Sequence, residues 1–322
     1  VLASIFFFGW WNPGYVGRII FSLVVNFSIG YYLGVSYEQT KKRRQALLIL
    51  GLCFNLGLLA YFKYTNFFLG NLNAVFNAHF PNEHIILPLG ISFFIFQKVA
   101  YLIDAYKGKA REYSFPNFCL FITFFPQLIA GPIVHHSEVM PQFKKSRFVF
   151  SHSDLAIGIT IFSIGLFKKV MLADNLALYA TPVFDMAKGS EPVGSVMAWI
   201  GALCFTFQIY FDFSGYSDMA IGLGRMFGIK LPLNFNSPYK AVGIIDFWRR
   251  WHMTLSRFLR DYLYIPLGGG RCGKVRRYVN LMVVMILGGL WHGANWTFVI
   301  WGSCHGFYLV VYHIWRNGLE KF

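Results

Sequence analysis

Residues Val16–Val35 read VGRIIFSLVVNFSIGYYLGV, and this stretch decides the class of fold. Its only charged side chain is Arg18. A helix needs roughly 20 consecutive apolar residues to cross a bilayer. The pattern recurs in further stretches, which we predict to be transmembrane helices: Ala46–Tyr64, Leu155–Leu178, Ser195–Phe213 and Trp296–Trp315.

The composition of the whole chain is typical of a membrane protein. Of the 322 residues, 56% are hydrophobic, 20% are aromatic and 13% are charged, and the mean hydropathy is +0.48. A soluble globular protein carries about 25% charged residues. The chain therefore has too little polar surface for a soluble protein of its length.

The positive charge is arranged as in membrane proteins and does not indicate nucleic-acid binding. The net charge is +15, but the basic residues form short runs between apolar stretches, such as Lys41–Arg44, Lys107–Arg111 and Arg271–Arg277. Loops of this kind stay on the cytoplasmic side of a membrane. We therefore place Lys41–Arg44 in the cytoplasm and the loop Asn66–His84, which lacks Lys and Arg, outside.

Several weaker segments bring the expected number of membrane segments to about eight or nine, given the length that a bilayer requires. They are Val1–Trp11, Ile85–Asp104, Phe115–Ile133 and the short run Tyr278–Trp291. Prolines and a glycine interrupt Phe115–Ile133, so we predict that it dips into the membrane and returns. We expect one membrane domain over residues 1–322, truncated at both ends.

The segment Gly243–Leu263, GIIDFWRRWHMTLSRFLRDYL, has a different pattern. On one continuous helix its aromatic and aliphatic residues would share a face, with Arg249 and Arg250 on the opposite face. This pattern predicts an amphipathic helix in the membrane interface. His252 falls within the apolar face, where it is either a packing residue or part of a site.

His292 is the strongest candidate for chemistry. It lies in LGGLWHGANW (Leu287–Trp296), between two apolar segments, with glycines on both sides. Glycine allows another chain or a substrate to approach closely. An ionisable side chain at membrane depth is by default a functional candidate, and a neutral imidazole suits a general base. A histidine that only packs between helices is the alternative.

Two acidic residues follow a predicted span. Asp212 and Asp218 lie in YFDFSGYSD, where carboxylates face a polar cavity or pair with an arginine such as Arg225 or Arg249. His135, His136 and Glu138 resemble a metal cluster only weakly, and we predict no metal site. The basic loop after Gly268 could attract a phosphate-bearing thioester donor.

These segments together resemble the membrane-bound O-acyltransferase family, in the branch of the alginate and peptidoglycan O-acetylation proteins and the teichoic acid D-alanyl transfer protein. The matching stretches are Leu87–Gly108, Phe124–Ile133, Asp212–Tyr239, Asp246–Gly269 and Leu287–Trp296. The resemblance implies an all-α polytopic bundle that forms a ring around a central tunnel. It also implies that His292 is catalytic, that His252 is the second active-site histidine and that both face the tunnel.

The resemblance further implies a function. We expect transfer of an acyl group, acetyl in the first instance, from acetyl-CoA or an acyl-carrier thioester to an extracytoplasmic polysaccharide. We expect no bound cofactor, a periplasmic acetyltransferase as partner, and residence in the bacterial cytoplasmic membrane. Supporting residues around the tunnel would be Asp212, Asp218, Trp291, Asn295, Arg249 and Arg250.

Other functions remain open at this point. A transporter would explain interrupted helices and buried charge. D-alanyl transfer to teichoic acid, or acyl transfer to a lipid or a protein, would use the same motifs. The non-enzymatic alternative is a subunit that only recruits another transferase or only conducts the acyl group.

Overall fold

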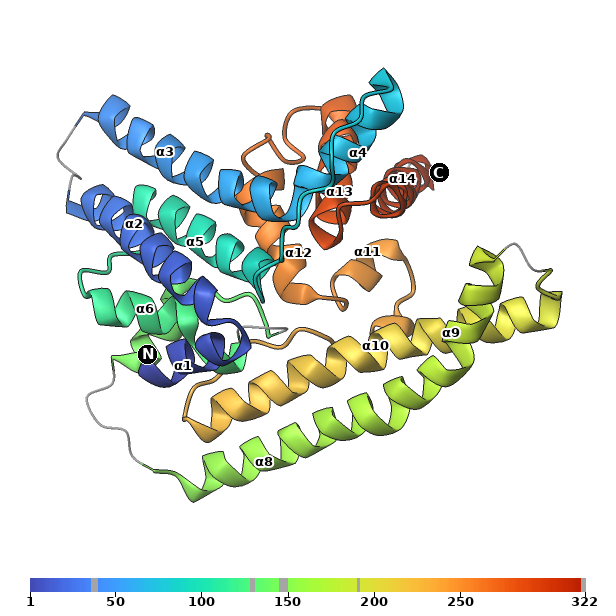
Figure 1. Cartoon of the computed structure of the whole chain (residues 1–322), viewed down its shortest axis with the longest axis horizontal. Helices are drawn as coiled ribbons and strands as arrows, with labels where there is room; N and C mark the ends of the chain where they lie inside the picture. Colours follow the sequence, from blue (N-terminus) through green and yellow to red (C-terminus); the bar gives the residue numbers. More distant parts are fainter. Residues whose placement is uncertain (36–39, 128–130, 145–149, 190–191, 320–322) are drawn as a thin grey trace. The chain divides into compact units, whose positions relative to one another are not determined.

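The computed structural model describes residues 1–35, 40–127, 131–144, 150–189 and 192–319. Every regular element within these residues is helical, which confirms the all-α prediction (Figure 1). The chain divides into two compact units. The first comprises Val1–Phe124, His135–Ser137 and Asn236–Phe322, and the second comprises Phe125–Val134 and Glu138–Phe235.

The first unit contains both histidine motifs, around His252 and His292. Its α-helices are α1 (Leu2–Trp11), α2 (Val16–Val35), α3 (Lys41–Leu59), α4 (Thr65–Phe76), α5 (Ile91–Tyr106), α6 (Phe115–Thr123), α11 (Ile244–Trp248), α12 (Met253–Leu259), α13 (Lys274–His292) and α14 (Trp296–Leu319). Two π-helical turns interrupt this series, at Ala60–Tyr64 and Arg260–Tyr264. Short 3-10 turns lie at Pro13–Tyr15 and Pro238–Lys240.

The second unit is built on two long helical stretches. Its elements are a 3-10 turn (Phe125–Gln127), most of α7 (His136–Phe143), α8 (His152–Phe167), a π-helical turn (Lys168–Ala173), α9 (Asp174–Lys188) and α10 (Ser195–Met226). The α8 helix begins where the Ser151 hydroxyl accepts a hydrogen bond from the Asp154 amide. Such a cap satisfies an amide that has no partner within the helix.

Among the residues that the structure describes, four helical stretches are long and apolar enough to cross a membrane. They are Pro13–Val35, Lys41–Phe76, His152–Lys188 and Ser195–Met226. Each contains one of the predicted spans, so four of the five strong predictions are confirmed as helices of sufficient length and hydropathy. The fifth, Trp296–Trp315, is helical as part of α14 but is not among these four stretches.

The helices α2, α3 and α5 pack side by side in the first unit (Figure 1). Asn26 of α2 and Asn55 of α3 exchange side-chain hydrogen bonds of 2.6 and 3.3 Å. From α5, the buried Lys98 ammonium donates a 2.8 Å hydrogen bond to the Ser22 hydroxyl of α2. Polar side chains between apolar helices hold them together when each group has a partner.

Glycines set the contact between α8 and α10, which run alongside each other in Figure 1. A Cβ atom added to Gly165 of α8 would lie 2.6 Å from the carbonyl oxygen of Gly215 of α10. A Cβ atom added to Gly222 would lie 2.6 Å from the carbonyl oxygen of Gly158. Small residues at these crossings let two helix backbones approach closely.

The predicted dipping segment Phe115–Ile133 is interrupted as its prolines suggest. The α6 helix ends at Thr123 and a 3-10 turn follows at Phe125–Gln127, while residues 128–130 lie outside the described part of the chain. The interruption agrees with the sequence. That the segment dips into the membrane stays a prediction.

Candidate active site

The predicted single helix over Gly243–Leu263 is wrong. The segment forms α11, a turn at Arg249–His252, α12 and then a π-helical turn. The break falls at His252, whose backbone is left-handed with φ 41° and ψ 53°. Left-handed backbone at a non-glycine residue costs roughly 1–2 kcal/mol and concentrates at functional sites.

His252 is completely buried, with 0% of its surface exposed. The burial agrees with its place on the predicted apolar face, although the helix is broken there. Around the turn, Asn236 donates a backbone hydrogen bond of 2.9 Å to the carbonyl of Arg250. The Arg250 side chain donates a 2.9 Å hydrogen bond to Asp246, and this bond lowers the pKa of the Asp246 carboxyl below its usual range. These contacts fix the turn that carries His252.

His292 is the last residue of α13, and α14 begins four residues later at Trp296. The break that the glycines predict is therefore present. Gly289 lies against the backbone of Phe298 and Gly302 of α14, so a side chain at position 289 would collide with that helix. The His292 side chain is exposed in this chain, whereas His252 is buried.

Trp291 connects the two histidines. Its indole centroid lies 5.0 Å from the His292 ring and 6.3 Å from the His252 ring. The indole stacks on Phe96 of α5 with a centroid distance of 4.9 Å and an interplanar angle of 16°. Both predicted catalytic histidines therefore contact one buried aromatic side chain.

A second aromatic cluster continues from His292 along α14. The His292 ring lies 5.2 Å from Trp301, and Trp301 lies 4.6 Å from His305. Trp248 at the end of α11 lies 5.2 Å from the same His305 ring. In the described part of the chain, Trp291 Nε1, Trp248 Nε1 and His305 Nδ1 are buried without a hydrogen-bond partner. Buried polar atoms of this kind call for a partner.

Lys63 and Tyr64 bind the end of α13, a feature that our reading of the sequence missed. Lys63 Nζ donates hydrogen bonds to the carbonyl oxygen of Trp291 and, at 3.1 Å, to the hydroxyl of Ser92. The Tyr64 hydroxyl donates a 2.7 Å hydrogen bond to the carbonyl oxygen of Leu290. A lysine inside a predicted membrane span signals that the side chain needs a polar partner, although the sequence does not say which one.

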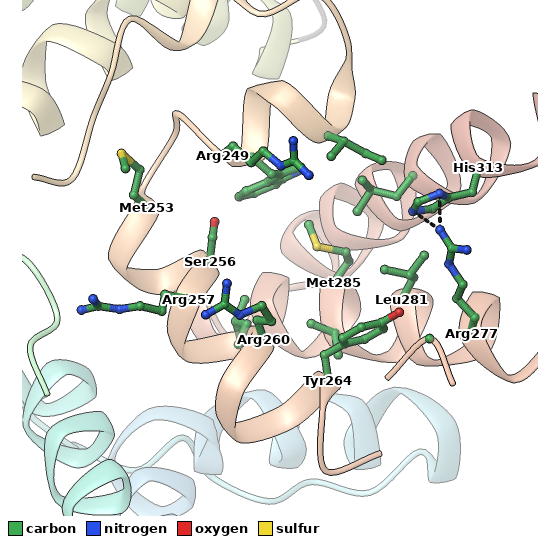
Figure 2. A pocket seen from close by; sticks show the side chains of 16 residues that line it. Arg249, Met253, Ser256, Arg257, Arg260, Tyr264, Arg277, Leu281, Met285 and His313 are labelled. Atoms are coloured by element: carbon green, nitrogen blue, oxygen red, sulfur yellow. Dashed lines mark hydrogen bonds between the residues drawn. The ribbon is translucent and has the colours of Figure 1, made fainter. Parts of the chain in front are cut away.

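An open cavity of about 770 Å³ lies beside the α11–α12 turn. Its wall includes Trp248 and Met253, which flank the turn, and an apolar side formed by α13 and α14. Figure 2 shows the polar side chains of the wall, with Arg277 bonded to His313. Among the described residues its lining includes four arginines, Arg249, Arg257, Arg260 and Arg277, of which Arg260 pairs with Asp261 at 2.7 Å. Such a cavity suits an anionic group attached to an apolar chain.

Asp212 and Asp218 pair with lysines of the second unit. The Lys169 ammonium lies 2.6 Å from the Asp212 carboxylate, and the Lys168 ammonium lies 2.6 Å from Asp218. The predicted arginine partner, Arg225, instead pairs with Asp154 at 2.7 Å. Of the two alternatives for these acids, a polar cavity or an ion pair, the ion pair is present, but its partners are lysines of the π-helical turn and not arginines.

The remaining candidates have local structural contacts. The Asn295 side chain accepts hydrogen bonds from the amide and hydroxyl of Thr297 and so caps α14. His135 contacts Tyr262 at 2.8 Å, and His136 faces Glu112 at 3.6 Å, so the two do not share a partner in these contacts. Within the described ranges no group of three metal-ligating side chains is present.

Comparison with known proteins decides the family. Residues 33–322 match the membrane-bound O-acyltransferase family. The chain belongs to this family. Membrane-bound O-acyltransferases that it resembles include a protein of Helicobacter pylori named "Peptidoglycan O-acetyltransferase", which is 49% identical over 100% of this chain and 65% of its own length.

Two further relatives carry different names. "Probable alginate O-acetylase AlgI" of Azotobacter vinelandii is 45% identical over 96% of this chain and 62% of its own length. "Teichoic acid D-alanyltransferase" of Bacillus subtilis is 29% identical over 76% of this chain and 63% of its own length. This membrane-bound O-acyltransferase chain thus spans somewhat less than two thirds of the length of these relatives.

Proposed function

We propose that this chain carries the acyl-transfer site of an enzyme in the bacterial cytoplasmic membrane. The enzyme moves an acyl group, acetyl in the first instance, from a cytoplasmic thioester to an extracytoplasmic polysaccharide. The observation that carries the proposal is the placement of His252 and His292 against the same indole, Trp291, at two interruptions of the helical backbone. The names of the relatives in Helicobacter pylori and Azotobacter vinelandii support acetyl transfer to a polymer.

In the proposed reaction, His292 removes the proton from an acceptor hydroxyl, whose oxygen attacks the carbonyl carbon of the thioester. The carbon–sulfur bond then breaks, and the proton passes to the departing thiolate. General-base catalysis accounts for about 10²–10⁴-fold in rate. His252, fixed by its turn and by Trp291, orients the reacting groups. Asp212 and Asp218 stay candidates for supporting roles.

The arginine-lined cavity supports a phosphate-bearing donor. Acetyl-CoA and an acyl-carrier thioester both combine phosphate groups with a thioester on a flexible arm. Arginine forms strong, directional hydrogen bonds with phosphate, and an apolar wall accommodates the arm. We propose that the donor approaches the site through the cavity that includes Arg249 and Arg257. A periplasmic acetyltransferase partner is the proposed route by which the acyl group reaches the polymer.

The test is to measure base-labile acetyl esters on purified envelope polymers. Four strains are compared: wild type, a deletion, His292→Ala and His152→Ala, the last two at matched membrane abundance. His152 is an exposed residue that begins α8 and serves as the control. The proposal expects esters to be lost in the deletion and in His292→Ala, and kept in His152→Ala.

Other outcomes would change the assignment. Acetyl esters that persist in His292→Ala would contradict the general-base role and favour a conduit for the acyl group. Loss of D-alanine esters in place of acetyl esters would assign the reaction suggested by the name of the Bacillus subtilis relative.

A further inference from the structure

Lys63 reaches the candidate active site from a segment far away in sequence. It lies in the π-helical turn Ala60–Tyr64 that joins α3 to α4. Turns of this type occur as interruptions of α-helices and are frequent at functional sites. The interruption presents two consecutive side chains, Lys63 and Tyr64, to the last turn of α13.

The main contact of Lys63 is with Trp291, the residue whose ring lies against both histidines. Its ammonium donates to the carbonyl of Trp291 and lies 5.6 Å from the centre of the Trp291 ring. A 3.1 Å hydrogen bond to Ser92 of α5 holds the ammonium from the other side. The charge of Lys63 also acts electrostatically on the His292 imidazole.

Two roles could explain such contacts. The carbonyl groups in the last turn of a helix have no partner within it, and cations are favoured at that end. Capping alone would therefore account for the bond to Trp291. Tyr64 caps the neighbouring carbonyl of Leu290 without bringing a charge. A comparison of variants at Lys63 and Tyr64 can therefore distinguish an effect of capping from an effect of charge.

We infer that Lys63 is a positioning residue that holds Trp291 and His292 in place and supplies a positive charge beside them. This inference rests on the proposed acyl transfer. When the acceptor oxygen attacks the thioester carbonyl, negative charge develops on the carbonyl oxygen. A fixed positive charge close to the base stabilises that charge without reorganisation of solvent. The bond to the Trp291 carbonyl fixes the residue that contacts both imidazoles.

The experiment measures the initial rate of acetyl-ester formation on the envelope polymer after induction, with the full-length protein at matched membrane abundance. The variants are Lys63→Met, Lys63→Arg and Tyr64→Phe, with His292→Ala beside them. Lys63→Met keeps much of the apolar stem of the side chain but removes the charge and the hydrogen bonds. Tyr64→Phe removes only the bond to Leu290.

The expected result is a fall of about 10²-fold in Lys63→Met, because misplacement of a reacting group costs that much. Lys63→Arg, which keeps the charge and the donors, recovers at least a tenth of the wild-type rate. Tyr64→Phe stays within about threefold of wild type, since a neutral hydrogen bond contributes little net free energy. Unfolding temperatures of the purified variants are expected to match.

Three results would overturn the inference. They are a wild-type rate in Lys63→Met while His292→Ala is inactive, equal losses in Lys63→Met and Tyr64→Phe, or no recovery in Lys63→Arg. Failure of the proposed function has a different signature, because esters would then persist in His292→Ala whatever the Lys63 variants do.

Discussion

The ring centroids of His252 and Trp291 lie 6.3 Å apart, although the two residues come from separate segments of the chain. The indole is 7% exposed and stacks on Phe96, so its position is fixed by packing. Both histidines take their positions partly from this ring. Substitutions of Trp291 should therefore affect the chemistry as well as the packing.

A first prediction concerns the stability and activity of the variants Trp291→Phe and Trp291→Ala. The alanine variant leaves a cavity between both histidines and Phe96 and is expected to lose about 3–5 kcal/mol of stability. The phenylalanine variant keeps an aromatic ring and should lose about half as much. Thermal unfolding of the purified protein gives stability, and the polymer-ester rate gives activity. Equal stability of the two variants would contradict the buried position of the indole.

A second prediction uses the left-handed backbone of His252. Asparagine adopts this conformation readily, whereas a β-branched residue does so only with strain. His252→Asn is therefore expected to reach wild-type membrane abundance and to lose most of the ester formation. His252→Val should unfold at a lower temperature, with a loss of at least about 1 kcal/mol. Equal unfolding temperatures of His252→Asn and His252→Val would show that the turn at 249–252 adjusts to either residue without strain.

The sequence predicted the end of α13 but not the shape of the segment around His252. Glycines on both sides of Trp291 and His292 mark a break, because glycine permits both a helix end and a close approach of α14. The α11–α12 turn carries no such mark. Its apolar residues keep a helical spacing, and His252 is neither glycine nor asparagine, so the pattern looks continuous.

The contacts of Lys63 and of the two aspartates could not be read from the sequence for a different reason. Lys63 and Trp291 are 228 positions apart, and only tertiary packing brings them together. Asp212 and Asp218 could be seen to need a cation, but several basic residues were available. The choice of Lys168 and Lys169 follows from the packing of α10 against their π-helical turn.

A third prediction concerns donor binding in the arginine-lined cavity. Arg249→Gln with Arg260→Gln removes two exposed positive charges from its wall. In isolated membranes supplied with acetyl-CoA, the double variant should show a KM raised about tenfold with kcat nearly unchanged. Added salt should raise the wild-type KM more than that of the variant, because salt screens exposed charges. Arg18→Gln, an exposed arginine outside this cavity, is the control.

A fourth prediction follows from the burial of Lys98. Its ammonium is buried in α5, and its hydrogen bond goes to the neutral hydroxyl of Ser22. Burying a charge without an opposite charge costs free energy, and an apolar side chain of similar volume avoids that cost. Lys98→Met is therefore expected to unfold at the same temperature as wild type or above it. A clear loss of stability would show that the bond to Ser22 outweighs the cost of burial.

The fifth prediction tests the glycine contacts between α8 and α10. In Gly215→Ala the new methyl group would lie 2.8 Å from the carbonyl oxygen of Gly165 and 3.1 Å from the amide of Lys169. Because both are backbone atoms, the helices must move apart, at a cost of about 1–3 kcal/mol.

Gly57→Ala in α3 is the matched control, since no atom lies within 4 Å of its added Cβ. Alanine favours a helix over glycine by roughly 0.5–1 kcal/mol, so this variant should be slightly stabilised. Thermal unfolding should therefore separate the two in opposite directions, and a stable Gly215→Ala protein would show that α8 and α10 can part without loss.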